Sequence, residues 1–408
     1  MYPLFEIPMV GGPLLIAAIA TFHIIPSHVA TGAFWITYFI ERKALRENRP
    51  ELLEFLKKLS LSILIFCFVT GSLTGVGIWF AATVLSPRAI SGLIHTYVWG
   101  WAAEWVFFVI EIVAIYVYYY TFDKINPKTH LRIGLIYAVA AWFSMVIITG
   151  ILGFMLTPGG WLETGGFFAG FFNQTYWPQL LFRTAMMFAI AGAYAALVAA
   201  TLRDGGRDTV RRIAGRWGLV GLLAAGGFAA WYYMVLPANA LENLASIGYV
   251  AIMFKLAIVA AVLLGGYFLL LASGRGWFVN AWVGTAMMAL LFAGIIGMVV
   301  MHFSIASYLM GAPGPDGELP LWIVIGRWSN LLVALLLLAY PGQEFFACTR
   351  LPQDEDGPPT HVHRLHRRGA ALAVAGADED ADAPEVDLAL QPLVEVLEGK
   401  RTVHFHTH

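Results

Sequence analysis

The sequence predicts an all-α fold: a polytopic membrane helix bundle of about nine transmembrane helices, with the N-terminus outside and the C-terminus inside. Three observations predict it: the composition, a series of long apolar runs, and the placement of lysine and arginine. Of the 408 residues, 59% are apolar and 12% are charged, which is too little charge for the surface of an ordinary soluble protein of this size. The formal net charge of -1 gives no sign of nucleic-acid binding.

The apolar runs are each long enough to cross a membrane as a helix, in which the backbone satisfies its own hydrogen bonds. They cover residues 13–40, 56–85, 94–121, 131–156, 179–202, 213–236, 247–273, 278–304 and 320–340. No basic segment precedes the first run. We therefore expect this run to remain as a transmembrane helix rather than to be cleaved as a signal peptide.

Lysine and arginine gather in the connections that follow the first, third and fifth runs. These residues are Arg42, Lys43, Arg46, Arg49, Lys57, Lys58, Lys124, Lys128, Arg132, Arg203, Arg207, Arg211, Arg212 and Arg216. Because basic loops stay on the cytoplasmic side, this placement predicts an outside N-terminus. The alternate connections are rich in Gly, Pro, Trp and Asn. That composition indicates either ordered loops that dock another polypeptide or cover a site, or an aromatic belt with simple turns.

Three regions follow from this pattern. Residues 1–205 hold five predicted helices, residues 206–342 hold four more, and residues 343–408 are charged and rich in Ala and Pro, which is typical of a flexible cytoplasmic tail. The closing "HFHTH" could bind a metal, but a solvated tail is favoured.

The two cysteines, Cys67 and Cys348, belong to no CxxC or CxxCH pattern. A covalently attached c-type haem, an iron–sulfur cluster and a structural disulfide are therefore not expected in this chain.

Histidines lie where an apolar run should hold only hydrocarbon. His23, His28, His95 and His302 all fall in the predicted outer half of the membrane, and neutral imidazole is a common ligand of haem iron. His23 and His28 are five residues apart, about 140° around a helix, so they cannot both face one iron. One can be an axial ligand, while the other faces a second haem, binds a propionate or bonds to a backbone carbonyl. The inner half contributes only His130, at its border.

Charged residues accompany these histidines. Glu104 and Glu111 are seven apart and share one stripe of a helix, which suits a proton path, although each could instead be a neutral, locally bonded carboxyl. Arg183 must pair with an anion, such as a haem propionate, unless its side chain snorkels to the interface. For Lys255 and Glu242 a structural role is favoured.

Several segments resemble subunit I of the cytochrome bd quinol oxidases. The run "LLIAAIATFHIIPSHVATGAFWITYFIE" is similar to the first helix of that family, and "AEWVFFVIE" is similar to its carboxylate-bearing third helix. "GILGFMLTPGGW" and "FFNQTYWPQLLFRTAMMFAIAGAYA" resemble its fourth and fifth helices, so the resemblance covers about residues 1–200. It implies that His23 ligates a high-spin b haem, and that Glu104 and Glu111 serve the oxygen-reactive haem and the proton path.

The chain departs from the family pattern at three points. The spacing from Glu104 to Glu111 is one residue shorter, Arg183 replaces a histidine that ligates the low-spin haem, and the long outer quinol-binding loop shrinks to "PANALENLASIG". His28, His95 and His302 have no counterpart in the family pattern. We interpret them as candidates for rebuilt haem ligation on the outer side.

The leading functional hypothesis is a haem b electron-transfer subunit of a respiratory complex in the bacterial cytoplasmic membrane. It would link the quinone pool to a periplasmic c-type cytochrome, and it would work beside other membrane subunits. The first alternative is a divergent bd-type quinol oxidase that reduces oxygen near Glu104. The second is a haem-free anchor subunit or proton channel. A transporter is disfavoured, because no inverted repeat is visible in the sequence.

Overall fold

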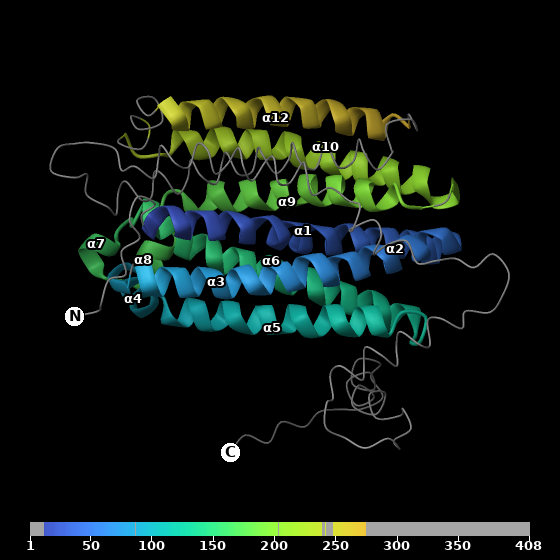
Figure 1. Cartoon of the computed structure of the whole chain (residues 1–408), viewed down its shortest axis with the longest axis horizontal. Helices are drawn as coiled ribbons and strands as arrows, with labels where there is room; N and C mark the ends of the chain where they lie inside the picture. The colour runs from blue at the N-terminus through green and yellow to red at the C-terminus, as the bar shows by residue number, and fades with distance from the viewer. Residues whose placement is uncertain (1–11, 86, 203, 239–240, 242–247, 275–408) are drawn as a thin grey trace, which may run out of the picture. The chain divides into compact units, whose positions relative to one another are not determined.

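The computed structural model describes residues 12–85, 87–202, 204–238, 241 and 248–274 (Figure 1). The last two predicted runs, the predicted tail, Glu242 and His302 lie outside these residues.

The described residues form helices and connecting turns, and no strand occurs among them. The helices are α1 (Gly12–Glu47), α2 (Pro50–Ile63), the π-helical η1 (Leu64–Val69), α3 (Thr70–Leu85), α4 (Pro87–Thr96), α5 (Val98–Tyr120), α6 (Pro127–Leu156), α7 (Trp161–Thr164), α8 (Phe167–Phe171), α9 (Tyr176–Ala199), α10 (Asp204–Met234) and α12 (Gly248–Ala272). Proline opens α2 and α6 at a position where its missing N–H costs nothing, and the Asn126 side chain caps α6 by accepting from the Lys128 N–H at 2.9 Å.

Five segments within the described residues are long and apolar enough to cross a membrane. They are Pro50–Leu85, Val98–Tyr120, Pro127–Leu156, Tyr176–Ala199 and Gly206–Met234. The prediction of an all-α, multi-pass membrane protein is thus confirmed, whereas the count of nine helices stays a prediction. The third predicted run, 94–121, is divided: α4 ends at Thr96, and α5 begins after Tyr97.

The long helices lie side by side with their axes nearly parallel (Figure 1). α1 packs against α3, α6 and α9, α5 packs against α6, and α10 lies between α9 and α12. The contact between α1 and α9 depends on Gly32, because a Cβ there would lie only 2.1 Å from the carbonyl oxygen of Met187. This close approach brings His28 of α1 within electrostatic range of α9.

The basic connections meet at one end of the bundle, which we call the basic end (residues 46–58, 121–132, 200–202 and 204–212). Arg49 donates to the Thr209 hydroxyl at 3.0 Å, and Lys57 lies 3.7 Å from Asp123. The alternating topology expected from the sequence is therefore present in the described helices. Which end faces the cytoplasm stays a prediction.

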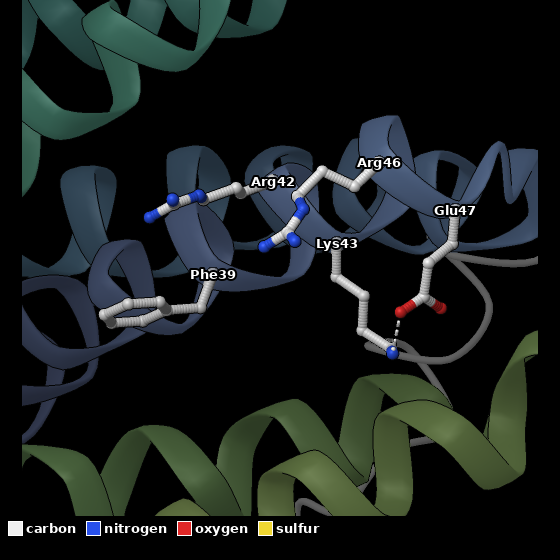
Figure 2. A pocket seen from close by; sticks show the side chains of 5 residues that line it. All are labelled: Phe39, Arg42, Lys43, Arg46 and Glu47. Atoms are coloured by element: carbon white, nitrogen blue, oxygen red, sulfur yellow. Dashed lines mark hydrogen bonds and ion pairs between the residues drawn. The ribbon is translucent and has the colours of Figure 1, made fainter.

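A shallow recess lies beside the C-terminal part of α1, next to the basic end. Figure 2 shows its lining of Phe39, Arg42, Lys43, Arg46 and Glu47, in which Lys43 and Glu47 form an ion pair. Phe39 is eleven residues beyond His28, about 16 Å along the helix axis. The recess is therefore separate from the histidines.

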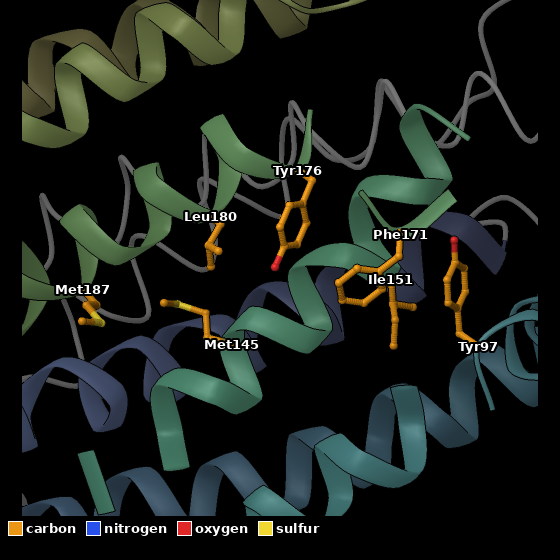
Figure 3. Close-up of a cluster of buried hydrophobic side chains, with 7 residues drawn as sticks. All are labelled: Tyr97, Met145, Ile151, Phe171, Tyr176, Leu180 and Met187. Atoms are coloured by element: carbon orange, nitrogen blue, oxygen red, sulfur yellow. The ribbon is translucent and has the colours of Figure 1, made fainter. Parts of the chain in front are cut away.

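A cluster of buried aromatic, aliphatic and methionine side chains fixes α6 and α9 to the short helix α8 near the opposite end (Figure 3). Its buried members are Tyr97, Met145, Ile151, Phe171, Tyr176, Leu180 and Met187. Tyr97 packs edge-on against Phe154 and Phe167, with ring centroids 5.0 and 5.2 Å away. Tyr97, the residue between α4 and α5, is thus held in place by aromatic packing.

Candidate functional site

His23 lies on α1 and faces the junction of η1 and α3. Its Nδ1 atom is 3.0 Å from the Gly71 carbonyl oxygen and 3.2 Å from the Thr74 hydroxyl. A carbonyl oxygen can only accept, so Nδ1 carries the proton and donates it. In the neutral ring, Nε2 is then the atom with a free lone pair, as a metal ligand requires.

His28 has the same tautomer, fixed by a carbonyl oxygen of its own helix. Its Nδ1 donates to the Ile24 carbonyl oxygen of its own helix at 3.0 Å, and the residue is 8% exposed. The two histidines face different helices, as their predicted separation of about 140° requires. His23 turns to α3, whereas His28 lies within electrostatic range of Arg183 on α9.

Arg183 lies two turns inside α9, because this helix begins at Tyr176 rather than at residue 179. Its Nη1 donates to the Thr149 hydroxyl of α6 at 3.2 Å, and Tyr232 of α10 is within electrostatic range. Among the described residues no carboxylate pairs with this guanidinium. A half-buried cation of this kind, within the bundle, calls for an anion from outside the described residues.

The surroundings of His23 fit a haem. The Nδ1 contact fixes the ring, Nε2 is the available electron-pair donor, and Gly75 lets the imidazole pack closely on α3, because a Cβ there would lie 3.1 Å from Cε1. Histidine with its second nitrogen bonded to a backbone carbonyl is the usual donor arrangement for an axial ligand. Arg183 adds a positive charge suited to a propionate.

Glu104 and Glu111 project from α5 toward α6. Glu104 accepts a hydrogen bond from the Ser144 hydroxyl at 3.0 Å, and Glu111 is 8% exposed, within electrostatic range of Tyr137. The two carboxyls also lie within electrostatic range of each other. Glu104 and Glu111 therefore lie on one face of α5, as their spacing predicts.

The other candidates stand apart from this group. His95 is exposed on α4, and its Nδ1 donates to the Ser91 carbonyl oxygen at 2.6 Å. Lys255 is exposed on α12. The structure brings together His23, His28 and Arg183, and separately Glu104 and Glu111; the roles predicted for all of these residues stay predictions.

The connection between α6 and α9 is ordered. Asn173 holds it: its Oδ1 accepts from the hydroxyls of Thr157 and Thr175, each at 2.8 Å, and its Nδ2 donates to the Gly170 carbonyl oxygen at 2.9 Å. This network agrees with the ordered loop expected at the end opposite the basic one. Docking of another polypeptide on the loop stays a prediction.

Sequence reasoning missed a second buried polar group. Glu41, Tyr118 and His130 form hydrogen bonds near the basic end, and Tyr137 lies within electrostatic range of Glu111. One signal could have found them: Glu104, Glu111 and Tyr118 are spaced by seven residues, and so are His130, Tyr137 and Ser144.

Comparisons with known proteins agree with this arrangement. A family model described as "Cytochrome bd terminal oxidase subunit I" matches residues 14–233, which is more than half of the chain. A search of curated proteins found no match. The bd oxidase structure from Geobacillus thermodenitrificans is similar with a TM-score of 0.57 and 16% identity, over 88% of this chain and 99% of that chain.

At that identity the structural likeness shows the fold alone. The family match covers α1 with His23, α5 with its two glutamates, and α9 with Arg183. The chain therefore belongs to the cytochrome bd terminal oxidase subunit I family.

Proposed function

We propose that this chain is the haem-binding subunit of a bd-type quinol oxidase in the bacterial cytoplasmic membrane, where it works with other membrane subunits. The observation that carries the proposal is the His23 ring on α1, whose Nδ1 is bonded to Gly71 while Nε2 is available, within the region that the family model matches. The complex would oxidise membrane quinol and reduce oxygen.

His23 would hold the iron of a haem b through Nε2, and Gly75 makes room for the His23 imidazole against α3. A bound haem supplies one-electron transfer and, at an open axial position, oxygen binding. Arg183 would bind a propionate, which neutralises its charge. His28 would ligate a second iron through Nε2, because its Nδ1 is likewise bonded to a carbonyl.

Glu104 and Glu111 would handle the protons consumed when oxygen is reduced. Buried carboxyls can hold a proton at little cost and release it to a neighbour, and the Ser144 hydroxyl keeps the Glu104 carboxyl turned toward α6.

The family match favours this oxidase over the relay from the quinone pool to a c-type cytochrome that led the sequence analysis. No described residue singles out a docking site for a cytochrome. Arg183, in place of the family histidine, remains the departure that any account of electron supply must explain.

The purified complex tests the proposal. We expect a b-type absorption after reduction with dithionite, and quinol-dependent oxygen uptake. His23→Ala should lose most of the haem absorption, whereas His95→Ala, an exposed histidine outside the group, should keep it. Glu104→Ala should retain haem but slow oxygen uptake about 100-fold or more, the contribution typical of a positioned proton-transfer group.

Two results would contradict the proposal. A wild-type complex without b-type absorption would favour the haem-free anchor. A complex with haem but without quinol-dependent oxygen uptake would return the electron-transfer relay to first place.

A further inference from the structure

Polar residues of α5 and α6 face each other at three levels, in contact at the first and third, and we call these six residues the α5–α6 ladder. The Ser144 hydroxyl donates to Glu104 at 3.0 Å, Glu111 lies within electrostatic range of Tyr137, and the rings of Tyr118 and His130 have centroids 4.0 Å apart. No role follows from the family match for the pair formed by Tyr118 and His130.

The spacing of the ladder follows from helix geometry. On each helix its members are seven residues apart, so successive pairs are separated by about 10 Å along the axis and stay on one face. The two helices run in opposite directions, and the pair with Tyr118 and His130 therefore lies at the basic end. The ladder leads from there to Glu104, in the half of the bundle that holds His23.

A third helix completes the pair at the basic end. Glu41 of α1 places Oε1 2.6 Å from Nδ1 of His130, and its Oε2 accepts from the Tyr118 hydroxyl at 2.9 Å. The other ring nitrogen, Nε2, is 2.9 Å from the Tyr118 backbone carbonyl oxygen. The side chains of His130 and Glu41 are only 6% and 3% exposed.

These contacts leave one proton with two possible positions. Nε2 of His130 must carry a hydrogen, because the Tyr118 carbonyl oxygen can only accept. The contact between Nδ1 and Glu41 Oε1 then contains one further proton, which lies on either atom. Moving it converts a buried ion pair into a neutral pair without moving a heavy atom, and burial makes the neutral pair accessible.

Aromatic rings lie on two sides of the Glu41–His130 pair, one toward the surface and one toward Glu111. Toward the surface, Phe122 packs edge-on against His130 with centroids 4.7 Å apart; the exposed Lys57 lies over that ring and pairs with Asp123. Toward Glu111, Phe34 packs on Tyr118 and on Tyr137, with centroids 5.2 and 3.9 Å away.

The middle of the ladder offers a free hydroxyl. The buried hydroxyl of Tyr137 has no hydrogen-bond partner among the described residues. A polar atom of this kind can bind a water between the basic-end pair and Glu111.

We propose that Glu41 and His130 hold a transferable proton and load the α5–α6 ladder from the basic end. This rests on the proposed oxidase function, which consumes protons. A proton that arrives from the basic side adds to the pair, giving a neutral Glu41 carboxyl and a His130 imidazolium. The Glu41 proton then passes through water beside Tyr137 to the Glu111 carboxylate, which becomes neutral. The Glu41–His130 pair is left with the single proton shared between Oε1 and Nδ1.

The test replaces the carboxylate without removing its hydrogen bonds. In Glu41→Gln the amide N–H can donate to His130 Nδ1 and the amide oxygen can accept from Tyr118, but the side chain cannot bind the proton. The reduced holo-complex is mixed with oxygen, and proton uptake is followed with a pH-indicator dye. We expect uptake about 100-fold slower than in the wild type, with haem content unchanged.

Two further variants separate proton transfer from structure. Glu41→Asp keeps a carboxylate and should restore most of the uptake rate. Tyr194→Phe removes another buried contact, the 2.5 Å hydrogen bond between Ser62 and Tyr194, and should leave the rate unchanged. If Glu41→Gln does not assemble, a slowed His130→Gln complex with normal haem content would carry the same conclusion.

The outcomes distinguish the two proposals. Wild-type rates of proton uptake in Glu41→Gln, in a complex that reduces oxygen, would overturn the loading role and leave the oxidase function intact. A wild-type complex that takes up no oxygen would instead overturn the oxidase function.

Discussion

At the scale of single residues, the positive charge of Arg183 is the feature that we expect to influence most the midpoint potential of a haem at His23. The guanidinium bonds to Thr149, lies within electrostatic range of His28, and has no carboxylate partner among the described residues. Its net charge is therefore felt by any redox group held at His23. A positive charge stabilises the reduced form of haem iron, since reduction adds an electron.

Arg183→Gln should lower the midpoint potential of the haem. A unit charge about 10 Å away, at an effective dielectric constant of about 20, is worth about 1.7 kcal/mol, or about 70 mV for one electron. A spectroscopic redox titration measures the shift. Lys255→Gln, which removes a charge from the exposed side of α12, should leave the potential unchanged. Equal potentials in wild type and Arg183→Gln would mean that Arg183 does not face the haem.

At the scale of helices, function depends on how closely α1 approaches α9. Gly32 allows this contact, which holds α1 and α9 where His28 lies within electrostatic range of Arg183. The residues of α1 serve three neighbours in succession: His23 faces α3, His28 faces α9, and Glu41 faces α5 and α6. Displacing this one helix would therefore disturb both the candidate haem site and the basic-end pair.

Gly32→Ala should separate α1 from α9, because the added Cβ would lie 2.1 Å from the Met187 carbonyl oxygen. We expect a loss of about 1–3 kcal/mol in the free energy of unfolding, the usual cost of overpacking, together with a lower haem-to-protein ratio. Thermal unfolding in detergent measures the first and a reduced spectrum the second. Gly226→Ala is the matched control, because nothing lies within 4 Å of a Cβ at that position. Equal stability of the two variants would contradict a tight contact.

At the scale of the whole molecule, the two ends of the bundle differ in chemistry. The basic end holds the arginine and lysine connections and the exposed pair of Lys57 and Asp123. The opposite end holds the loop ordered by Asn173. The positive-inside rule assigns the basic end to the cytoplasm, and the loading role of Glu41 and His130 then implies that protons come from that side.

Cysteine labelling in intact cells tests this orientation. In a background with C67S and C348S, Glu163→Cys on the opposite end should react with a membrane-impermeant maleimide. Asp123→Cys at the basic end should react only after the cells are permeabilised. Both side chains are exposed, so accessibility within the protein does not limit the comparison. The reverse labelling pattern would place the N-terminus inside.

Prediction from sequence succeeded where information is local. Apolar runs and helix periodicity located the helices among the described residues, and the spacing of Glu104 and Glu111 placed both on one face. It failed at the break beside Tyr97, where ring packing interrupts an apolar run, and at the beginning of α9, where three further residues join the helix. Neither the break at Tyr97 nor the earlier start of α9 changes the hydropathy of the sequence, so the apolar runs could not predict them.

The sequence by itself determined the membrane class, the alternation of basic and glycine-rich connections, and His23 as the first candidate ligand. Only the tertiary structure decided the tautomer of His23 and the position of His28 within electrostatic range of Arg183. It also decided the pairing of Glu41 with His130, which are 89 positions apart. The physical reason is that hydropathy and helix period depend on neighbouring residues. A hydrogen bond between helices depends instead on the rotation and register of each helix, which packing contacts such as the one at Gly32 fix.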